Sequence, residues 1–232
     1  MSKLTVIEGT DCSGKETQSR LLIQKLNEEG IKAARLSFPM YETSTGRIIG
    51  ACYLGKEEMC KDNLKEGTFG FFEEGAPNVD PIASSLFYAA DRRYNLPIIE
   101  KAMTENDVLV LDRYTYSNMA HQGGKLKSID DKISMFKTLD YLEFEICKLP
   151  RPDKVLFLYV PYEIAYDLRN NRTETLDQLE SDKEHLKNAE ETYLQLAKYY
   201  NFETINCFND DKMKSIEEIH KDVYKRVRKM IK

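Results

Sequence analysis

The chain has 232 residues, of which 41% are hydrophobic and 31% are charged, a balance typical of a globular domain in water. Its 34 basic and 39 acidic residues give a net charge of −5, which argues against partners such as a nucleic-acid polymer or an anionic membrane. No apolar run approaches the roughly 20 residues that cross a bilayer. The N-terminus does not resemble a signal peptide, and the five cysteines lack C-x-x-C spacing, so we expect a cytoplasmic protein with reduced thiols.

Short apolar segments alternate with amphipathic segments along the chain. The expected strands cover residues 4–9, 33–39, 107–113, 153–160 and 202–208. The expected helices cover residues 14–30, 81–103, 131–148, 161–171, 181–200 and 215–231, and Pro97 should kink or split the second of them. Strands that alternate with helices require crossover connections, so this order predicts an α/β fold with a five-stranded parallel sheet flanked by helices. Ligands of such sheets bind beyond the carboxyl ends of the strands.

Two helices begin with the pattern of a capping box. Ser181 with Glu184 should open one of them, and Ser215 with Glu218 should open the last. The segment 52–80 differs from the rest, because it contains five glycines or prolines and has weak periodicity. We interpret it as an extended loop within a single domain that spans residues 1–232.

The first expected strand leads into a loop with G-x-x-x-x-G-K spacing, which ends at Lys15. Between a buried strand and a helix, such a loop can hold phosphates with its backbone N–H groups, and the helix dipole favours the anion. The alternative is a glycine-rich turn with a solvated lysine. Position 16 holds Glu16 where a Ser or Thr hydroxyl usually ligates Mg²⁺. Glu16 either supplies an oxygen ligand to the ion or points to solvent while the metal is held elsewhere.

Two further segments carry charged residues where a phosphate site would need them. Asp112 ends the most hydrophobic expected strand, a position from which an acid organises Mg²⁺, and Arg113 follows with a fork of donors for a phosphate. A strand-end salt bridge is the simpler interpretation. Arg169 and Arg172 precede a polar stretch and suggest a lid over phosphates at about 168–182. A solvated helix end explains that spacing equally well.

An aromatic residue and an arginine share one face of the helix expected at 81–103. Tyr88 and Arg92 are four residues apart, and together they suit a base ring with carbonyl edges. In isolation, a core aromatic beside a surface arginine would be the better interpretation.

Several stretches, in the correct order, resemble the thymidylate kinase (dTMP kinase) family of P-loop nucleoside monophosphate kinases. They are IEGTDCSGKETQ (7–18), SFPMYETSTGRIIG (37–50), FYAADR (87–92), DRYTYSNMAHQGG (112–124) and RPDKVLFLYVPYEIAYDLR (151–169). The fourth matches the pattern D-R-Y-x-x-S-x-x-A-x-Q-G and is the most specific. The resemblance implies a P-loop NTPase three-layer sandwich with a short lid. It also implies phosphoryl transfer from ATP to dTMP, giving dTDP and ADP for dTTP synthesis, with Mg²⁺ and in a homodimer.

The resemblance also implies roles for particular residues. Those that would bind ATP are Gly9, Thr10, Asp11, Cys12, Ser13, Gly14, Lys15, Glu16 and Thr17. Those that would bind dTMP are Asp11, Phe38, Tyr41, Tyr88, Arg92, Arg113, Asn118, His121 and Gln122. Catalysis would depend on Lys15, Arg113, Arg169, Arg172 and Asp11. The metal would be held among Asp11, Glu16 and Asp112. Because the loop itself contains no arginine, the lid must provide the catalytic one.

Three alternatives to this function remain at the level of sequence. One is another small nucleotide or deoxynucleoside kinase on the same fold, for which Glu8 could act as the base that a nucleoside hydroxyl needs. Another is a non-catalytic nucleotide-binding module in which Glu16 has damaged the site. A GTP-dependent switch is disfavoured, because the chain has no N-K-x-D or T-K-x-D string.

Overall fold

The computed structural model describes residues 2–60, 70–170, 176–210 and 212–231. Five parallel strands form one sheet in the order β2-β3-β1-β4-β5. The strands are β1 (Lys3–Gly9), β2 (Ala33–Ser37), β3 (Val108–Asp112), β4 (Lys154–Tyr159) and β5 (Glu203–Asn206). All four pairings between neighbouring strands are parallel, which confirms the predicted fold class.

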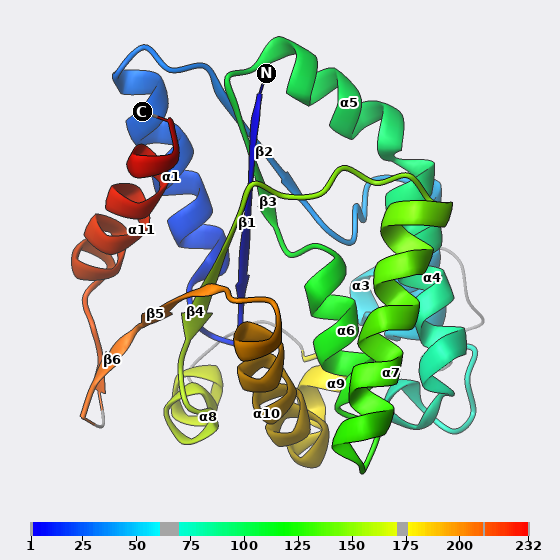
Figure 1. The fold of residues 1–232 in the computed structure, drawn as a ribbon. Coiled ribbons are helices and arrows are strands. Elements are labelled where there is room, and N and C mark those ends of the chain that lie inside the picture. Colours follow the sequence, from blue (N-terminus) through cyan, green and yellow to red (C-terminus); the bar gives the residue numbers. More distant parts are fainter. Residues whose placement is uncertain (1, 61–69, 171–175, 211, 232) are drawn as a thin grey trace.

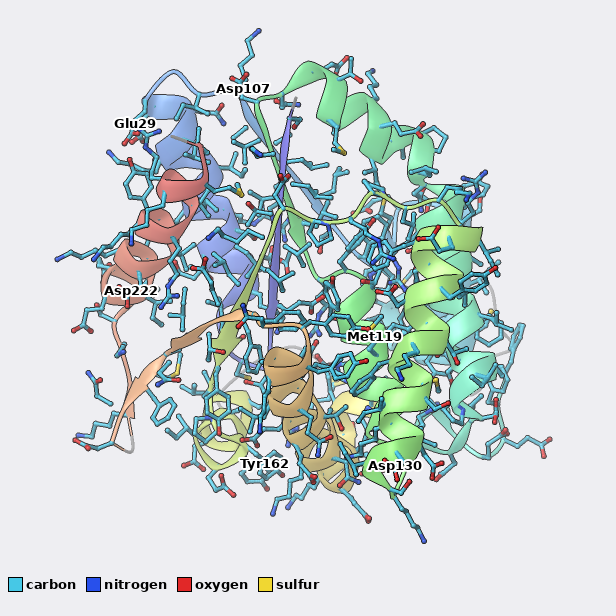
Figure 2. The ribbon with its side chains drawn as sticks, in the orientation of Figure 1. Glu29, Asp107, Met119, Asp130, Tyr162 and Asp222 are labelled. Atoms are coloured by element: carbon cyan, nitrogen blue, oxygen red, sulfur yellow. The ribbon has the colours of Figure 1, made fainter. Side chains whose placement is uncertain are left out.

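Helices cover both faces of the sheet. On one face lie α1 (Lys15–Glu28) and α11 (Ile216–Ile231), and on the other lie α4 (Pro81–Tyr94), α6 (Thr115–Gly123) and α7 (Ile129–Asp140) (Figure 1). The remaining longer helices are α5 (Leu96–Glu105), α8 (Tyr162–Asn170) and α10 (Lys183–Tyr199). In Figure 2, Met119 of α6 lies among closely packed side chains, whereas Asp130 and Asp222 lie at the periphery. None of the helices in the described ranges is long and apolar enough to cross a membrane.

The central strands contribute to two separate cores. Leu109 and Leu111 of β3 belong to the cluster on the side of α6, while Val108 and Val110 belong to the cluster on the side of α1 and α11. Successive side chains of a strand point to opposite faces, so a strand covered on both faces must be apolar throughout. This explains why the most hydrophobic segment of the chain forms β3, an interior strand beside the central strand β1.

The structure refines the expected boundaries of three elements. Pro97 lies in the first turn of α5 and separates it from α4, as expected from its missing N–H. The helix expected at 131–148 consists of α7 and a π-helical turn, η3 (Tyr141–Ile146). The strand expected at 202–208 ends at Asn206, and Phe208–Asn209 (β6) pairs antiparallel with Lys212–Met213 (β7) instead.

One of the two expected capping boxes is wrong. Ser181 ends the short helix α9 (Gln178–Ser181), and its hydroxyl donates to the Asp177 carbonyl. Asp182 caps α10 instead, accepting from the backbone N–H of His185 at 2.9 Å, since a carboxylate is an equally good N-cap. The box of Ser215 and Glu218 is confirmed by reciprocal hydrogen bonds.

The 52–80 segment is joined to the rest of the fold, and its residues 61–69 lie outside the described ranges. The region before and within it forms α2 (Ser44–Arg47), the π-helix η1 (Ile48–Tyr53), α3 (Glu57–Cys60) and the short η2 (Ala76–Asn78). Lys125, two residues after α6, donates to the carbonyls of Ala76 and Val79 at 3.0 and 2.8 Å. These bonds fix the second half of the segment against the helical face of the domain.

Candidate active site

A cleft of about 800 Å³ opens at the carboxyl ends of the central strands. Its walls are the β1–α1 loop, the segment after β2, α4, the β3–α6 turn, and parts of α8 and α9. This is the place where the strand order reverses direction around β1 and β3, as expected for a ligand site in an open parallel sheet.

The β1–α1 loop closes tightly around its lysine. The Nζ atom of Lys15 donates to the carbonyls of Gly9 and Thr10 at 2.9 and 2.8 Å. Gly14 has a φ of +79°, and a Cβ on Gly9 would lie 2.6 Å from the carbonyl oxygen of Leu158, so both positions require glycine. Burial, followed by the charge of Arg113, lowers the pKa of Lys15 to about 8. An incoming phosphate would reverse that effect.

Glu16 is the second residue of α1, and its side chain pairs with a residue of the same helix. Its carboxylate accepts from Nη2 and Nε of Arg20 at 2.8 and 3.0 Å, and both side chains are 65% exposed. Thr17 is also exposed and lines the cleft. The structure therefore shows Glu16 in a solvated ion pair at the mouth of the site.

Each of the other two candidate metal ligands is paired with an arginine. Arg113 donates to Asp11 at 3.0 Å, and Nη2 of Arg35 donates to Asp112 at 2.5 Å. Burial raises the pKa of Asp11, but the charges of Arg113 and Lys15 outweigh burial and hold that pKa below its ordinary value.

Among the residues that the structure describes, no cluster of three or more His, Cys, Asp or Glu side chains could hold a metal by itself. The site fits Mg²⁺ in the way usual for phosphate-transferring enzymes, in which nucleotide phosphates and waters supply most ligands and one or two carboxylates supply the rest. Asp112 and Asp11 are the carboxylates in place for that.

A buried carboxylate fixes the β3–α6 turn. Glu8 is fully buried and accepts from the backbone N–H groups of Tyr114 and Ser117, from the Ser117 hydroxyl and from the Tyr193 hydroxyl. Burial raises its pKa, although these hydrogen bonds oppose the rise. Arg113, at the start of this turn, has a φ of +63°, so the turn is held in an unfavourable conformation. Glu8 thus orients the turn that presents Arg113 and does not line the cleft.

The far wall of the cleft is aromatic. Phe38 and Tyr41 after β2, together with Tyr88 of α4, line it. Arg92 lies beside them and is 2% exposed, with Nε donating to Glu143 at 2.8 Å and Nη2 donating to the other oxygen of that carboxylate. Glu143 lies on η3, and no local pattern in the sequence pairs it with α4.

Residues of α6 divide between the cleft and the core. Asn118 lines the cleft and donates to the Ser85 carbonyl at 3.2 Å, whereas Gln122 is fully buried and lies outside the lining.

His121 lines the cleft, and its Nδ1 lies 3.1 Å from Nε2 of His185 on α10. Burial lowers the pKa of both rings, to about 4 for His185, so the pair is neutral near pH 7 and shares one hydrogen bond. No local pattern in the sequence pairs His185 with His121, because the two lie 64 residues apart.

The described part of the expected lid consists of the end of α8 and of α9. Arg169 lines the cleft, is 6% exposed and donates to the carbonyl of Glu180 at 2.7 Å. Lys56 forms an ion pair with Asp177 at 3.4 Å, which ties α9 to the 52–80 segment. Arg172 lies outside the described residues.

A model of the thymidylate kinase family matches residues 7–66 and 72–223 of the chain. The chain belongs to the thymidylate kinase family. The matched residues include the β1–α1 loop, the aromatic wall, the β3–α6 turn and α8, so the family assignment covers every wall of the cleft. The protein is therefore a nucleoside monophosphate kinase, as predicted from the motifs.

Individual thymidylate kinases are similar over most of their length. A probable thymidylate kinase of Methanocaldococcus jannaschii is 32% identical over 221 residues, which cover 94% of this chain and 92% of that protein. The thymidylate kinase of Homo sapiens is 29% identical over 220 residues, covering 95% and 87%. The structure of thymidylate kinase from Candida albicans is similar in fold, with a TM-score of 0.68 at 22% identity and coverage of 98% and 92%.

Proposed function

We propose that the protein transfers the terminal phosphoryl group of ATP to dTMP, giving dTDP and ADP. The observation that carries this proposal is that one cleft contains both the phosphate-binding loop with Lys15 and the aromatic wall with Tyr88 and Arg92. Arg113, joined to the loop through Asp11, lines the same cleft. A donor and an acceptor nucleotide can thus enter it from opposite ends.

The chemistry requires positioning and positive charge rather than a base. The acceptor is a phosphate monoester, which is largely ionised near neutral pH and needs no deprotonation. Lys15 would leave the Gly9 and Thr10 carbonyls to hold the donor phosphates, and Arg113 would bind the acceptor phosphate. Arg169, and Arg172 beyond the described residues, would neutralise charge that develops during transfer. When bound, Mg²⁺ supplies further charge neutralisation on the phosphates, with Asp112 and Asp11 as its protein ligands or partners of its waters.

The aromatic wall would bind thymine and its sugar. Tyr88 would stack on the base, and Phe38 and Tyr41 would form the walls of the base pocket. Arg92, held by Glu143, would face a carbonyl edge of the base. Asn118 and His121 would line the pocket for base and sugar, and Asp11 would face the sugar hydroxyl. Gln122 would support this wall from the core. Glu16 would remain outside the metal coordination, consistent with its pair with Arg20.

The deoxynucleoside kinase alternative is less well supported by this geometry. A nucleoside hydroxyl needs a base, and Glu8, the candidate for that role, already accepts four hydrogen bonds away from the cleft. We also propose a cytoplasmic homodimer that works in dTTP synthesis, in line with the resemblance to the family.

A nucleotide panel tests the function directly. With ATP and Mg²⁺ as donor, dTMP should be phosphorylated with a higher kcat/KM than dUMP, dCMP, dGMP or thymidine. Lys15→Ala should lower dTMP turnover by on the order of a hundredfold or more, because the donor phosphates lose their main protein cation. Faster phosphorylation of thymidine than of dTMP would favour the nucleoside kinase. Binding of ATP and dTMP by calorimetry without turnover would favour a non-catalytic module.

A further inference from the structure

A guanidinium that the mechanism above does not use lies at the donor end of the cleft. Arg35 extends from β2, beside β3, and lines the cleft with a side chain that is 18% exposed. Its Nη2 donates to Asp112 at 2.5 Å, and its Nε donates to the Ser19 hydroxyl at 2.7 Å. It therefore engages the acid that ends β3 and a hydroxyl on α1 at the same time.

Asp112 and Ser19, like Asp11, carry oxygen atoms that a divalent ion could approach beside the loop. The position after Lys15 is Glu16, which has no hydroxyl and is paired with Arg20. Ser19 is a hydroxyl residue one turn further along α1; it is fully buried and lies 3.5 Å from Asp112. The guanidinium of Arg35, which is always charged, contacts both Ser19 and Asp112. In other phosphate-transferring enzymes a metal ion supplies the positive charge at such a position.

Arg35 makes the net charge of the ionised side chains around the loop positive. Around the loop the cleft is lined by the cations Lys15, Arg20, Arg35 and Arg113 and by the carboxylates Asp11, Glu16 and Asp112, so the net charge is +1 with Arg35 and 0 without it. Without Arg35, the carboxylate of Asp112, which is 5% exposed, would be a buried anion beside the expected position of the phosphates. That uncompensated carboxylate would repel the phosphates of a nucleotide without a metal ion and would attract a divalent ion bound to them.

We propose that Arg35 is a positioning residue that neutralises Asp112 and thereby allows a nucleoside di- or triphosphate to bind at the loop with little dependence on a divalent ion. The role rests on the proposed function, since it assumes that the loop is the donor site. It concerns binding of the nucleotide and not the transfer step, so it can be measured without turnover.

The test is the affinity for ADP, measured by calorimetry with excess Mg²⁺ and again with EDTA. For the unaltered protein, the two dissociation constants should agree within about threefold. Arg35→Met keeps the length of the side chain but removes the charge. It should weaken binding in EDTA by about tenfold or more, while binding with Mg²⁺ changes much less, because an uncompensated charge near the phosphates is worth more than about 1.4 kcal/mol.

Three variants separate this role from simple damage to the cleft. Arg35→Lys should keep the small ratio of the two constants. Arg20→Gln, which removes an exposed guanidinium from the same end of the cleft, should leave the ratio unchanged, because exposed ion pairs are screened. Arg35→Met combined with Asp112→Asn should recover much of the affinity in EDTA, since the anion that Arg35 neutralises is gone.

The outcomes are distinguishable. An Arg35→Met protein that binds ADP with the same Mg²⁺-to-EDTA ratio as the unaltered protein overturns the proposal. So does an equal loss of affinity in both conditions, which would show that Arg35 only supports the shape of the cleft. Failure of the unaltered protein to bind ADP even with Mg²⁺ would refute the donor site itself and, with it, the proposed function.

Discussion

At the residue scale, the ammonium of Lys15 is positioned to bind an anion. Its ammonium is bound by two carbonyl groups of its own loop, and burial with the nearby charge of Arg113 lowers its pKa to about 8. At pH 8.5, therefore, we expect a large fraction of the Lys15 side chains to be deprotonated in the free protein. Nucleotide phosphates favour the charged form, so binding must raise the pKa and draw a proton from solution.

This predicts proton uptake when ADP binds at pH 8.5. Calorimetry in two buffers with different ionisation enthalpies should give an uptake of about half a proton or more. At pH 7, where Lys15 is already charged, this contribution should be small. Lys15→Arg keeps the charge but cannot titrate in this range, so its uptake at pH 8.5 should vanish. A binding enthalpy independent of buffer at pH 8.5 would show that Lys15 does not change its protonation state.

Site residues could be predicted where their partners lie nearby in the sequence, and could not be predicted where their partners lie far away along the chain. The loop around Lys15 and the Asp112-Arg113 pair are visible because their spacing along the chain produces their geometry. Glu143 and Arg35 were missed because each meets its partner across the fold, 51 residues from Arg92 and 77 residues from Asp112. Sequence periodicity carries no information about such pairs, which depend on how elements pack.

At the scale of elements, Glu8 links β1 to the start of α6 and to α10. Its two oxygens accept from groups on three different elements, so it fixes the direction in which the β3–α6 turn leaves the sheet. A single apolar strand, β1, therefore carries the carboxylate that orients Arg113. From the sequence, Glu8 was considered only as a possible base, because the residue type alone does not distinguish a buried structural carboxylate from a catalytic one.

Replacing Glu8 should therefore affect stability first. Glu8→Ala would leave two backbone N–H groups and the Ser117 hydroxyl buried without this acceptor, whereas the Tyr193 hydroxyl could still donate to Ser117 Oγ at 2.9 Å. The free energy of unfolding should fall by about 3 kcal/mol or more, since each buried polar group without a hydrogen-bond partner costs about 1–3 kcal/mol. Glu8→Gln keeps an acceptor for the N–H groups and should lose less. Urea unfolding of the three proteins measures this order. An alanine variant as stable as the unaltered protein would show that the network contributes no net stability.

Element boundaries illustrate the same limit. The helix at 181–200 was predicted correctly in position, but its cap is Asp182 rather than Ser181, because both residues can accept from a helix N-terminus and only packing decides between them. The split at Pro97 was predictable, since proline lacks the N–H that a continuous helix would need.

At the scale of the whole molecule, one cleft must hold two nucleotides. The sheet contributes the loop and the β3–α6 turn, and the segment after β2 and α4 contribute the aromatic wall. Lys56 of the 52–80 segment pairs with Asp177 at the start of α9. The order of strands and helices along the chain predicted this architecture, because crossover connections bring the carboxyl ends of parallel strands to one edge. The order of elements could not predict that the 52–80 segment would also line the cleft, through Leu54 and Lys56.

If both sites face each other in this cleft, a single ligand that joins adenosine to thymidine through an oligophosphate should bind both at once. The second contact then occurs at high effective concentration, so the linked ligand should bind much more tightly than either part. Thermal unfolding tests this, since a ligand that binds only the folded protein raises the midpoint in proportion to RT ln(1 + [L]/Kd). The linked ligand should raise Tm by more than ADP and dTMP added together at equal concentration. Arg113→Ala, which removes the cation beside Asp11 in the cleft, should reduce that extra shift. A shift no larger than that of ADP alone would mean that the two phosphate ends do not meet in this cleft, and that phosphoryl transfer between them cannot take place there.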